Sequence, residues 1–212
     1  MKTAIFVRTN YDLTTAYSFQ WCQPVIEAAQ GRGFRTIVVE KEKVTKLEVS
    51  SRLTHVKPDF IFLSGHGTVD TFKGHLGEEV LSINSAEAFK GSIAYSRACN
   101  CLVGLGVKAV EKGCRAFIGY SREFWFVKQN EMQTRPLQDP AAKPIFEAAN
   151  AVSMSLIKGS NVREAIEQSH KVAIEKIKLA IYSPDPIVKA SLAPLISNDS
   201  CLEAIGDLES RI

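Results

Sequence analysis

FIFLSGHG at residues 60–67 and IAYSRAC at residues 93–99 are the two stretches of sequence that decide the fold. Each is a short apolar run that leads to a reactive side chain, His66 in the first and Cys99 in the second. Near-continuous apolar runs of this length are typical of strands buried on both faces of a parallel sheet. Because ligands bind at the carboxyl ends of such strands, we expect His66 and Cys99 to meet at one edge of the sheet if the strands are neighbours.

The rest of the chain alternates between short apolar runs and helical patterns, which predicts an α/β fold. We expect a three-layer sandwich with a mostly parallel central sheet. The predicted strands cover residues 3–9, 34–40, 59–64, 92–97, 115–120 and 201–205. The predicted helices cover residues 14–30, 46–55, 102–112, 144–158 and 161–182, with a further helix or irregular cover over 184–200. A hairpin is predicted over residues 70–82 and a loop over 121–143.

Composition is that of an ordinary globular protein. With 212 residues, 45% hydrophobic and 23% charged, the chain fits one domain over residues 1–212. The net charge of +3 is small and the basic residues are scattered, so no nucleic-acid partner is expected. No apolar run approaches the roughly 20 residues that span a bilayer, which predicts no membrane partner. Five irregularly spaced cysteines, without a secretory signal, indicate free thiols and a cytoplasmic location.

A thiol and an imidazole at one sheet edge are equipped for nucleophilic catalysis. A cysteine nucleophile needs a base within reach that removes its proton and later protonates the leaving amine. The glycines around His66 suit a tight backbone, and the Gly67 amide would be free to point at a developing oxyanion. A helix that begins near Leu102 would place its positive end close to Cys99, which favours the thiolate.

The order and spacing of these motifs resemble the caspase-like cysteine peptidases of clan CD, which include caspases, gingipains, clostripain, legumain, separase and the CHAT group. The shared pattern is a hydrophobic strand, His-Gly, and a second hydrophobic strand that ends in Ala-Cys. After the cysteine, GLGVKAVEKGCRAFIGYSREFW at residues 104–125 resembles the helix, turn, strand and tryptophan of the CHAT and gingipain branch. AIGDLESRI at residues 204–212 resembles the closing strand of that branch, with Leu208 where proline is usual.

The resemblance implies a cysteine endopeptidase that cleaves a protein or peptide substrate through a dyad. On this basis Cys99 is the nucleophile, His66 is the general base, and the backbone amides of Gly67 and Cys99 form the oxyanion hole. No cofactor is implied. Peptidases of this kind often depend on processing or on an activating partner, so a partner or a homodimer is compatible with the resemblance.

One departure from the family pattern leaves two alternatives open. Related chains often carry a small residue and then glycine soon after the cysteine, whereas here Cys99 is followed by Asn100 and Cys101. Cys101 is therefore an alternative nucleophile, although Cys99 follows Ala98 as the family pattern requires. The altered turn also allows an inactive caspase-like domain that serves in interactions, because a fold does not guarantee its usual function.

Substrate preference is tied to the loop after the first predicted strand. In related enzymes this loop often supplies a charged residue to the substrate pocket, and Asp12 would there bind Lys or Arg. The alternative role of Asp12 is to cap the helix that begins near Thr14. The loop over residues 121–135, with Glu123, Trp125 and Phe126, is the other candidate wall of the pocket.

Two further classes of site fit the residues less well. Cys99, Cys101 and His66 make an incomplete metal site, because the paired C-x-x-C spacing of zinc sites is missing, so no metal is expected. A nucleotide-binding fold would need a glycine-rich turn after the first strand, and the turn here reads Thr9-Asn10-Tyr11-Asp12.

Overall fold

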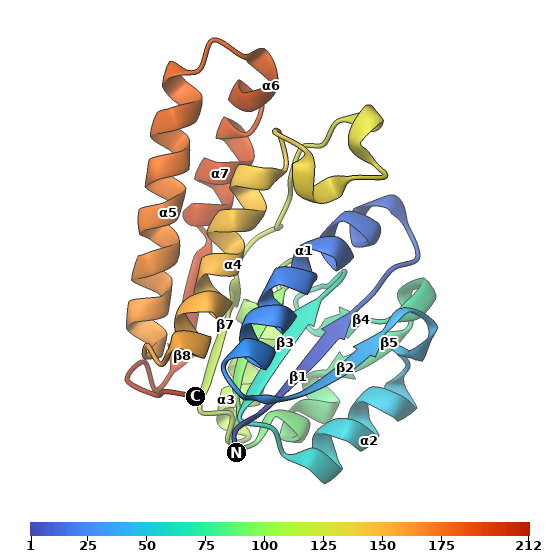
Figure 1. The fold of residues 1–212 in the computed structure, drawn as a ribbon. Helices are drawn as coiled ribbons and strands as arrows, with labels where there is room; N and C mark the ends of the chain where they lie inside the picture. The colour runs from blue at the N-terminus through green and yellow to red at the C-terminus, as the bar shows by residue number, and fades with distance from the viewer.

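The computed structural model describes residues 1–212 and contains a central sheet of six strands (Figure 1). The strand order is β2-β1-β3-β6-β7-β8, and every pair is parallel except β7 with β8. The predicted α/β class with a mostly parallel sheet is therefore confirmed. The strands are β1 (Thr3–Arg8), β2 (Arg35–Glu40), β3 (Phe60–Ser64), β6 (Ile93–Arg97), β7 (Ala116–Tyr120) and β8 (Leu202–Gly206).

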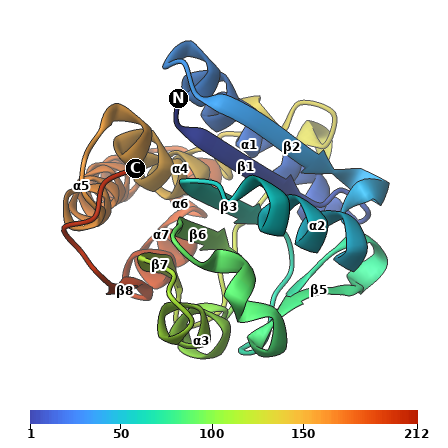
Figure 2. The same cartoon turned by 90° about the horizontal axis from the view of Figure 1, so that it is seen from below.

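Helices cover both faces of the sheet, as the end-on view in Figure 2 shows. One face carries α1 (Leu13–Gly31), α4 (Lys143–Lys158) and α5 (Val162–Tyr182). The other face carries α2 (Lys46–Val56), α3 (Val107–Glu111) and the 3₁₀ segment η3 (Ile83–Phe89). The remaining helical elements are short or peripheral: η1 (Lys41–Lys43), η2 (His75–Gly77), η5 (Asn130–Met132), η6 (Pro136–Gln138), α6 (Pro186–Lys189) and α7 (Leu192–Asp199).

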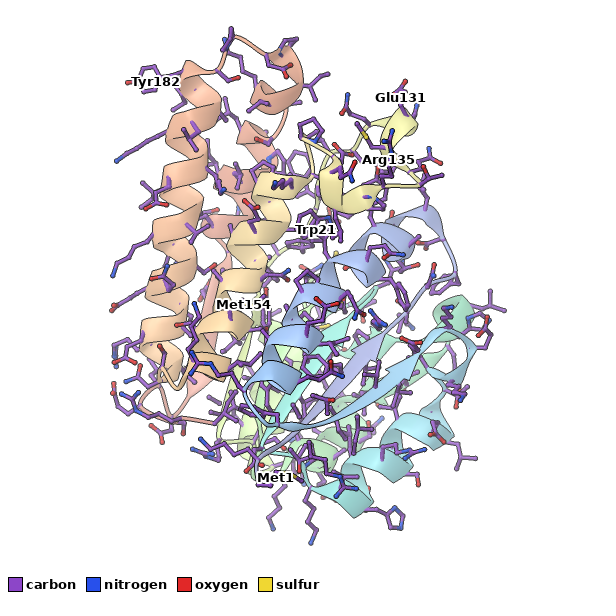
Figure 3. All side chains as sticks on the ribbon, in the orientation of Figure 1. Met1, Trp21, Glu131, Arg135, Met154 and Tyr182 are labelled. Atoms are coloured by element: carbon purple, nitrogen blue, oxygen red, sulfur yellow. The ribbon has the colours of Figure 1, made fainter.

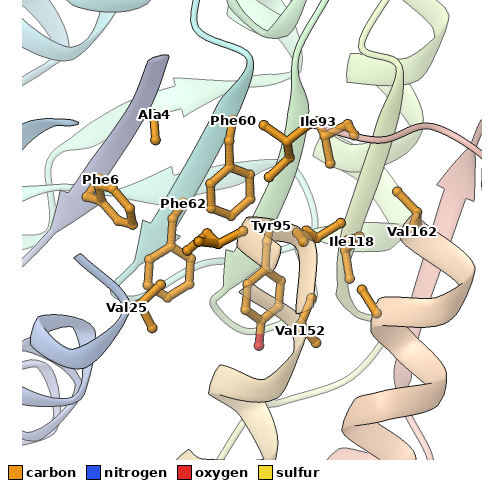
Figure 4. Packing of buried hydrophobic residues seen from close by; sticks show 14 of the residues in the cluster. Ala4, Phe6, Val25, Phe60, Phe62, Ile93, Tyr95, Ile118, Val152 and Val162 are labelled. Atoms are coloured by element: carbon orange, nitrogen blue, oxygen red, sulfur yellow. The ribbon is translucent and has the colours of Figure 1, made fainter. Parts of the chain in front are cut away.

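The core consists of two apolar layers, one on each face of the sheet. Side chains alternate along a strand, so Phe60 and Phe62 of β3 belong to the layer under α1 and α4, and Ile61 and Leu63 belong to the opposite layer. All five residues of β3 are buried. Figure 4 shows the first layer, in which Tyr95 of β6 stacks on Phe62 at a centroid distance of 5.3 Å. Burial on both faces explains why the strand sequences show no polar alternation.

The predicted hairpin is present as β4 (Thr71–Lys73) and β5 (Glu79–Ser82), which pair antiparallel beside the sheet. The helix predicted after Cys99 begins differently from the expectation. Its first part, η4 (Leu102–Gly106), is a π-helix, in which the Gly106 amide donates to the Cys101 carbonyl at 2.8 Å, and α3 follows it. Single π turns are frequent at functional sites, and residue periodicity does not reveal them.

The loop between β7 and α4 lies above the N-terminal end of α1, with Glu131 and Arg135 at its outer edge (Figure 3). Asp139 is fully buried and fixes this loop. Its carboxylate accepts hydrogen bonds from the Tyr17 hydroxyl at 3.0 Å and the Gln129 amide at 2.8 Å. The loop is therefore anchored to α1 although it has few elements of its own. Across the whole chain, none of the helices has the length and apolar content that crossing a membrane requires.

Candidate active site

His66 follows the end of β3, in a loop that turns tightly against its surroundings. Gly65 has no room for a side chain, because a Cβ there would lie 2.7 Å from Thr9 Oγ1. The Lys73 amide donates to the His66 carbonyl at 2.9 Å, which ties this loop to the hairpin. The imidazole itself is half-exposed, so it is accessible from the edge of the sheet.

Cys99 follows the end of β6, the neighbour of β3. The two strands are in register, with Ser64 opposite Arg97, so both chains leave the sheet at the same level. The thiol is partly buried, and it lines a cavity of about 30 Å³ together with His66. The structure therefore places the two predicted dyad residues on one cavity at the carboxyl edge of the sheet.

Gly67 shows how closely the two loops approach. A Cβ at this position would lie 2.5 Å from Cys101 Sγ, 2.9 Å from the Ala98 Cβ and 2.9 Å from the Cys99 carbonyl oxygen. Glycine is thus required by contact between the histidine loop and the cysteine loop. The amides of Gly67 and Cys99 donate to no backbone carbonyl. Their role as an oxyanion hole stays a prediction.

The turn after Cys99 is built around Asn100, whose φ of 59° lies in the left-handed region. Asparagine tolerates this region better than most residues, which explains why no glycine is needed at this position. The Asn100 amide donates to the Arg122 carbonyl at 3.1 Å. Cys101 then points into the core, where it is fully buried, and burial raises the pKa of its thiol to about 12. A buried neutral thiol is a poor nucleophile, so this geometry favours Cys99 over Cys101.

The surroundings of Cys99 favour the protonated form of its thiol. Burial raises the pKa of Cys99; a hydrogen bond from the Phe124 backbone opposes this effect, and the nearby Glu123 adds to it. The Sγ–O distance to Phe124 is 3.5 Å. The sequence-based expectation that the following helix favours a thiolate is therefore outweighed by desolvation, because an ionised thiol loses more hydration than a neutral one.

Asp12 lies at the N-terminus of α1 and contacts His66 directly. Its Oδ1 accepts from the Thr15 amide at 2.7 Å in a capping box, which confirms the alternative capping role. Its Oδ2 lies 2.7 Å from His66 Nε2. Because an ionised carboxylate can only accept, Nε2 carries the proton and Nδ1 is left as the free acceptor of a neutral ring. The role of Asp12 in binding a basic substrate stays a prediction.

Two residues of the loop over 121–135 form the apolar wall of the cavity. Phe124 and Phe126 line it, and both rings pack against Phe146 of α4, at centroid distances of 5.9 and 4.7 Å. Of the residues expected to form this wall, Phe126 lines the cavity, whereas Trp125 is 40% exposed and Glu123 is also exposed.

Two features of the site were missed by sequence reasoning. The Asp12–His66 pair joins residues 54 positions apart, and nothing in the local pattern indicates it. Arg97 also lines the cavity, although it is nearly fully buried. The sequence did contain an indication of this: Arg97 ends an otherwise apolar strand, two positions before Cys99.

Other cavities and clusters lack this chemistry. The largest cavity, about 680 Å³, lies between α4 and α5 and shares no residue with the site. No group of three or more His, Cys, Asp or Glu side chains is arranged to hold a metal ion.

The sheet topology defines the fold of this chain, which is the caspase-like α/β fold. One solved structure that shows this likeness is that of the Arg-specific cysteine proteinase gingipain R (RGPB), with a TM-score of 0.69 and 10% sequence identity. The match covers 99% of this chain and 47% of that chain, so the chain spans about half the length of the gingipain. At this identity the likeness shows the fold.

A second solved structure, an inactive zymogen of a C11 protease from Parabacteroides distasonis, matches with a TM-score of 0.43 at 13% identity. That match covers 84% of this chain and 65% of the other. No protein-family model and no curated protein matches the sequence. The narrower assignment to the CHAT and gingipain branch stays a prediction.

Replacing Gly67 with alanine tests the contact between the two loops. We expect Gly67→Ala to lower the free energy of unfolding by about 1–3 kcal/mol, the usual cost of forcing extra volume into a packed site. Urea unfolding measures the change. Gly31→Ala is the matched control, because a Cβ at residue 31 meets nothing within 4 Å. Equal stability of the two variants would contradict the close approach of Gly67 to Ala98 and Cys99.

Replacing Asp12 with asparagine tests the charge of the pair with His66, because asparagine caps a helix as well as aspartate does. Burial opposes ionisation of Asp12, but hydrogen bonds from Thr15 and His66 outweigh it and hold its pKa below the ordinary 3.8. A lowered pKa contributes stability above the unfolded-state value, and this contribution is lost as the pH falls through the folded-state value.

We therefore expect Asp12→Asn to be less stable than the wild type by about 0.5–1 kcal/mol at pH 7, since the pair is partly exposed. The difference should disappear in urea unfolding below the lowered pKa of Asp12. Asp12→Ala, which also removes the cap, should lose about 1 kcal/mol more. A pH-independent deficit in Asp12→Asn would show that the charge of Asp12 contributes nothing.

Proposed function

We propose that this chain is a cysteine endopeptidase in which Cys99 attacks the peptide carbonyl and His66 transfers the proton. The single observation that carries the proposal is the shared cavity: the Cys99 thiol and the His66 imidazole line one small space at the sheet edge. Gly67 lies next to the cysteine loop, and the Gly67 and Cys99 amides donate to no backbone carbonyl. The caspase-like fold supports it, because a solved structure with that fold, gingipain R, is a cysteine proteinase.

The first step forms an acyl-enzyme. His66, whose Nδ1 is free to accept, removes the thiol proton as Cys99 Sγ attacks the carbonyl carbon. The carbonyl oxygen becomes an oxyanion that the amides of Gly67 and Cys99 stabilise by hydrogen bonds. The protonated His66 then gives its proton to the amine of the leaving peptide, and the C–N bond breaks to leave a thioester on Cys99.

The second step regenerates the enzyme. His66 removes a proton from a water molecule, which attacks the thioester carbonyl through the same oxyanion arrangement. The C–S bond breaks, the acid product leaves, and the proton returns to the Cys99 sulfur. In both steps Asp12 is a positioning residue, because its carboxylate fixes the orientation and tautomer of His66 and stabilises the ring when it is charged.

A neutral thiol in the resting protein determines when Cys99 loses its proton. Because burial raises the pKa of Cys99, the resting protein favours the neutral thiol over the thiolate. Deprotonation accompanies attack instead, so the substrate must displace the Phe124 carbonyl as the partner of the thiol.

The same observation favours a second candidate function. A caspase-like domain that never ionises Cys99 would serve as an interaction or scaffold domain, and the thiol bonded to Phe124 fits that role as well. Turnover distinguishes the two functions.

The test uses quenched fluorescent peptides with randomised residues around the scissile bond, incubated with the wild type, Cys99→Ala and His66→Ala. We expect cleavage by the wild type, loss of turnover in Cys99→Ala, and a rate lower by about 10²–10⁴-fold in His66→Ala, the usual contribution of a general base. Mass spectrometry of the products would identify the cleaved bonds.

Cys101→Ala is the matched control, since it removes a neighbouring buried thiol. It should keep the wild-type mechanism and most of the rate. Loss of turnover in Cys101→Ala with retention in Cys99→Ala would assign the nucleophile to Cys101. Absence of cleavage by the wild type, with a folded protein, would favour the scaffold function.

A further inference from the structure

Residues 123–128, which we call the wall segment, form the side of the catalytic cavity that the backbone holds least. None of them belongs to a helix or a strand, and none makes a hydrogen bond to another backbone group. Both flanks are fixed: the Arg122 carbonyl accepts from the Asn100 amide at 3.1 Å, and the Gln129 amide donates to Asp139 at 2.8 Å. The backbone between these anchors is therefore held only by side chains of other elements.

Asn198 of α7 holds the middle of the wall segment. The Trp125 amide donates to Asn198 Oδ1 at 3.2 Å, and Asn198 Nδ2 donates to the Trp125 carbonyl at 2.8 Å. Asparagine makes both bonds because its side-chain amide contains an acceptor and a donor. The side chain is buried, so water does not compete for either bond. Asp199, the next residue, ties α7 to α5 through His170 Nδ1 at 2.7 Å.

The peptide group between Phe124 and Trp125 connects Asn198 to the thiol. Its carbonyl end, from Phe124, lies 3.5 Å from Cys99 Sγ, and its amide end, from Trp125, is bound by Asn198. A peptide group is planar and rigid, so fixing the amide end also fixes the carbonyl end. A substrate carbonyl needs the position beside Sγ that the Phe124 carbonyl occupies. The bond made by Asn198 therefore keeps the thiol covered.

The space around Phe124 is consistent with a wall that moves. The catalytic cavity, about 30 Å³, has room for about two or three water molecules, which is too little for a peptide. Phe124 also lines a second cavity of about 20 Å³, together with Leu195 and Asn198 of α7. No residue of α7 lines the catalytic cavity. Phe124 thus borders free space on the side of α7 as well as on the side of Cys99.

We propose that Asn198 is a positioning residue that, through the Phe124–Trp125 peptide group, holds the wall segment closed over Cys99, and that the site opens when this side chain lets go of Trp125. Access to the thiol is then controlled from α7, outside the cavity. Exposure of the thiol does not depend on peptidase activity; the effect on turnover rests on the proposed function.

Alkylation of the cysteines in the folded protein measures opening without requiring turnover. The protein is treated with iodoacetamide, and mass spectrometry follows each cysteine separately. We expect Asn198→Ala to raise the rate at Cys99 by about tenfold to a hundredfold, as loss of two neutral hydrogen bonds gives. Cys22 and Cys114, buried on opposite faces of the sheet, should keep their wild-type rates. An unchanged rate at Cys99, or an equal rise at all three cysteines, would overturn the inference.

Ile196→Ala is the matched control, because Ile196 lies on the same helix and is 54% exposed. It should leave the rate at Cys99 unchanged. A rise as large as that in Asn198→Ala would assign the effect to a loosened α7 and contradict the role of the bonds to Trp125. Asn198→Asp is a second variant of nearly the same size; it loses the donor and places an oxygen against the Trp125 carbonyl, so it should also speed alkylation of Cys99.

The pH profile of alkylation distinguishes opening of the wall segment from a general loss of stability. Burial is the largest cause that raises the pKa of Cys99, so a more exposed thiol should ionise closer to the ordinary value of 9.0. We expect the midpoint of the Cys99 profile to lie at lower pH in Asn198→Ala than in the wild type. A midpoint that stays or rises would contradict the inference.

A measurement on the wild type decides if neither Asn198 variant folds. The Trp125 amide and the Cys99 thiol should be released by the same opening. Amide exchange at Trp125, measured by NMR, should therefore be slowed by the same factor as alkylation at Cys99, each relative to an unfolded peptide. Exchange at Trp125 that is much faster than this factor allows would show that Asn198 does not hold the wall segment.

Cleavage of the quenched fluorescent peptides separates this inference from the proposed function. Faster alkylation and faster cleavage in Asn198→Ala support both. Faster alkylation without cleavage by any variant or by the wild type supports the role of Asn198 and contradicts the peptidase. Cleavage by the wild type, with alkylation of Cys99 unchanged in Asn198→Ala, retains the peptidase and contradicts the role of Asn198.

Discussion

The parallel pairing of β3 with β6 is the constraint on which the site depends. With Ser64 opposite Arg97, the two strands end at one level and release their loops side by side. The histidine loop and the cysteine loop are then in such close contact that residue 67 must be glycine. Because the strands are buried on both faces, a shift of one residue in the pairing would turn every side chain of the strand to the opposite face of the sheet. The packing of the core therefore fixes the register that brings the histidine loop and the cysteine loop together.

A hydrogen-bond network, in which the buried Arg97 guanidinium donates to neutral partners, connects the same elements next to the cavity. Arg97 of β6 bonds to Ser64 of β3, to the Ser18 carbonyl of α1 and to Asn150 of α4. Since Asp12 at the start of α1 contacts His66, this network also connects the cysteine loop to the helix that holds Asp12. Placing a cation here costs solvation free energy, which apolar residues of similar volume would not require.

The sequence predicted the fold well because both strand motifs are buried and continuous. Phe60–Ser64 and Ile93–Arg97 have the lengths and composition expected of central parallel strands, and the reactive residues follow them directly. What the sequence could not predict depends on contacts between distant segments. The pairing of Asp12 with His66, the raised pKa of Cys99 and the burial of Arg97 each arise from tertiary packing. The π turn after Cys101 cannot be recognised in the sequence, because its residues fit an ordinary α-helix equally well.

The central claim is that His66, Cys99 and two backbone amides act together on one carbonyl group. The most direct measurement is a crystal structure of the protein with a peptide aldehyde, which forms a reversible adduct with a catalytic thiol. The account predicts a bond from Cys99 Sγ to the aldehyde carbon, with the resulting oxygen about 2.7–3.1 Å from the amides of Gly67 and Cys99. An adduct on another cysteine, or an oxygen that points away from both amides, would contradict it.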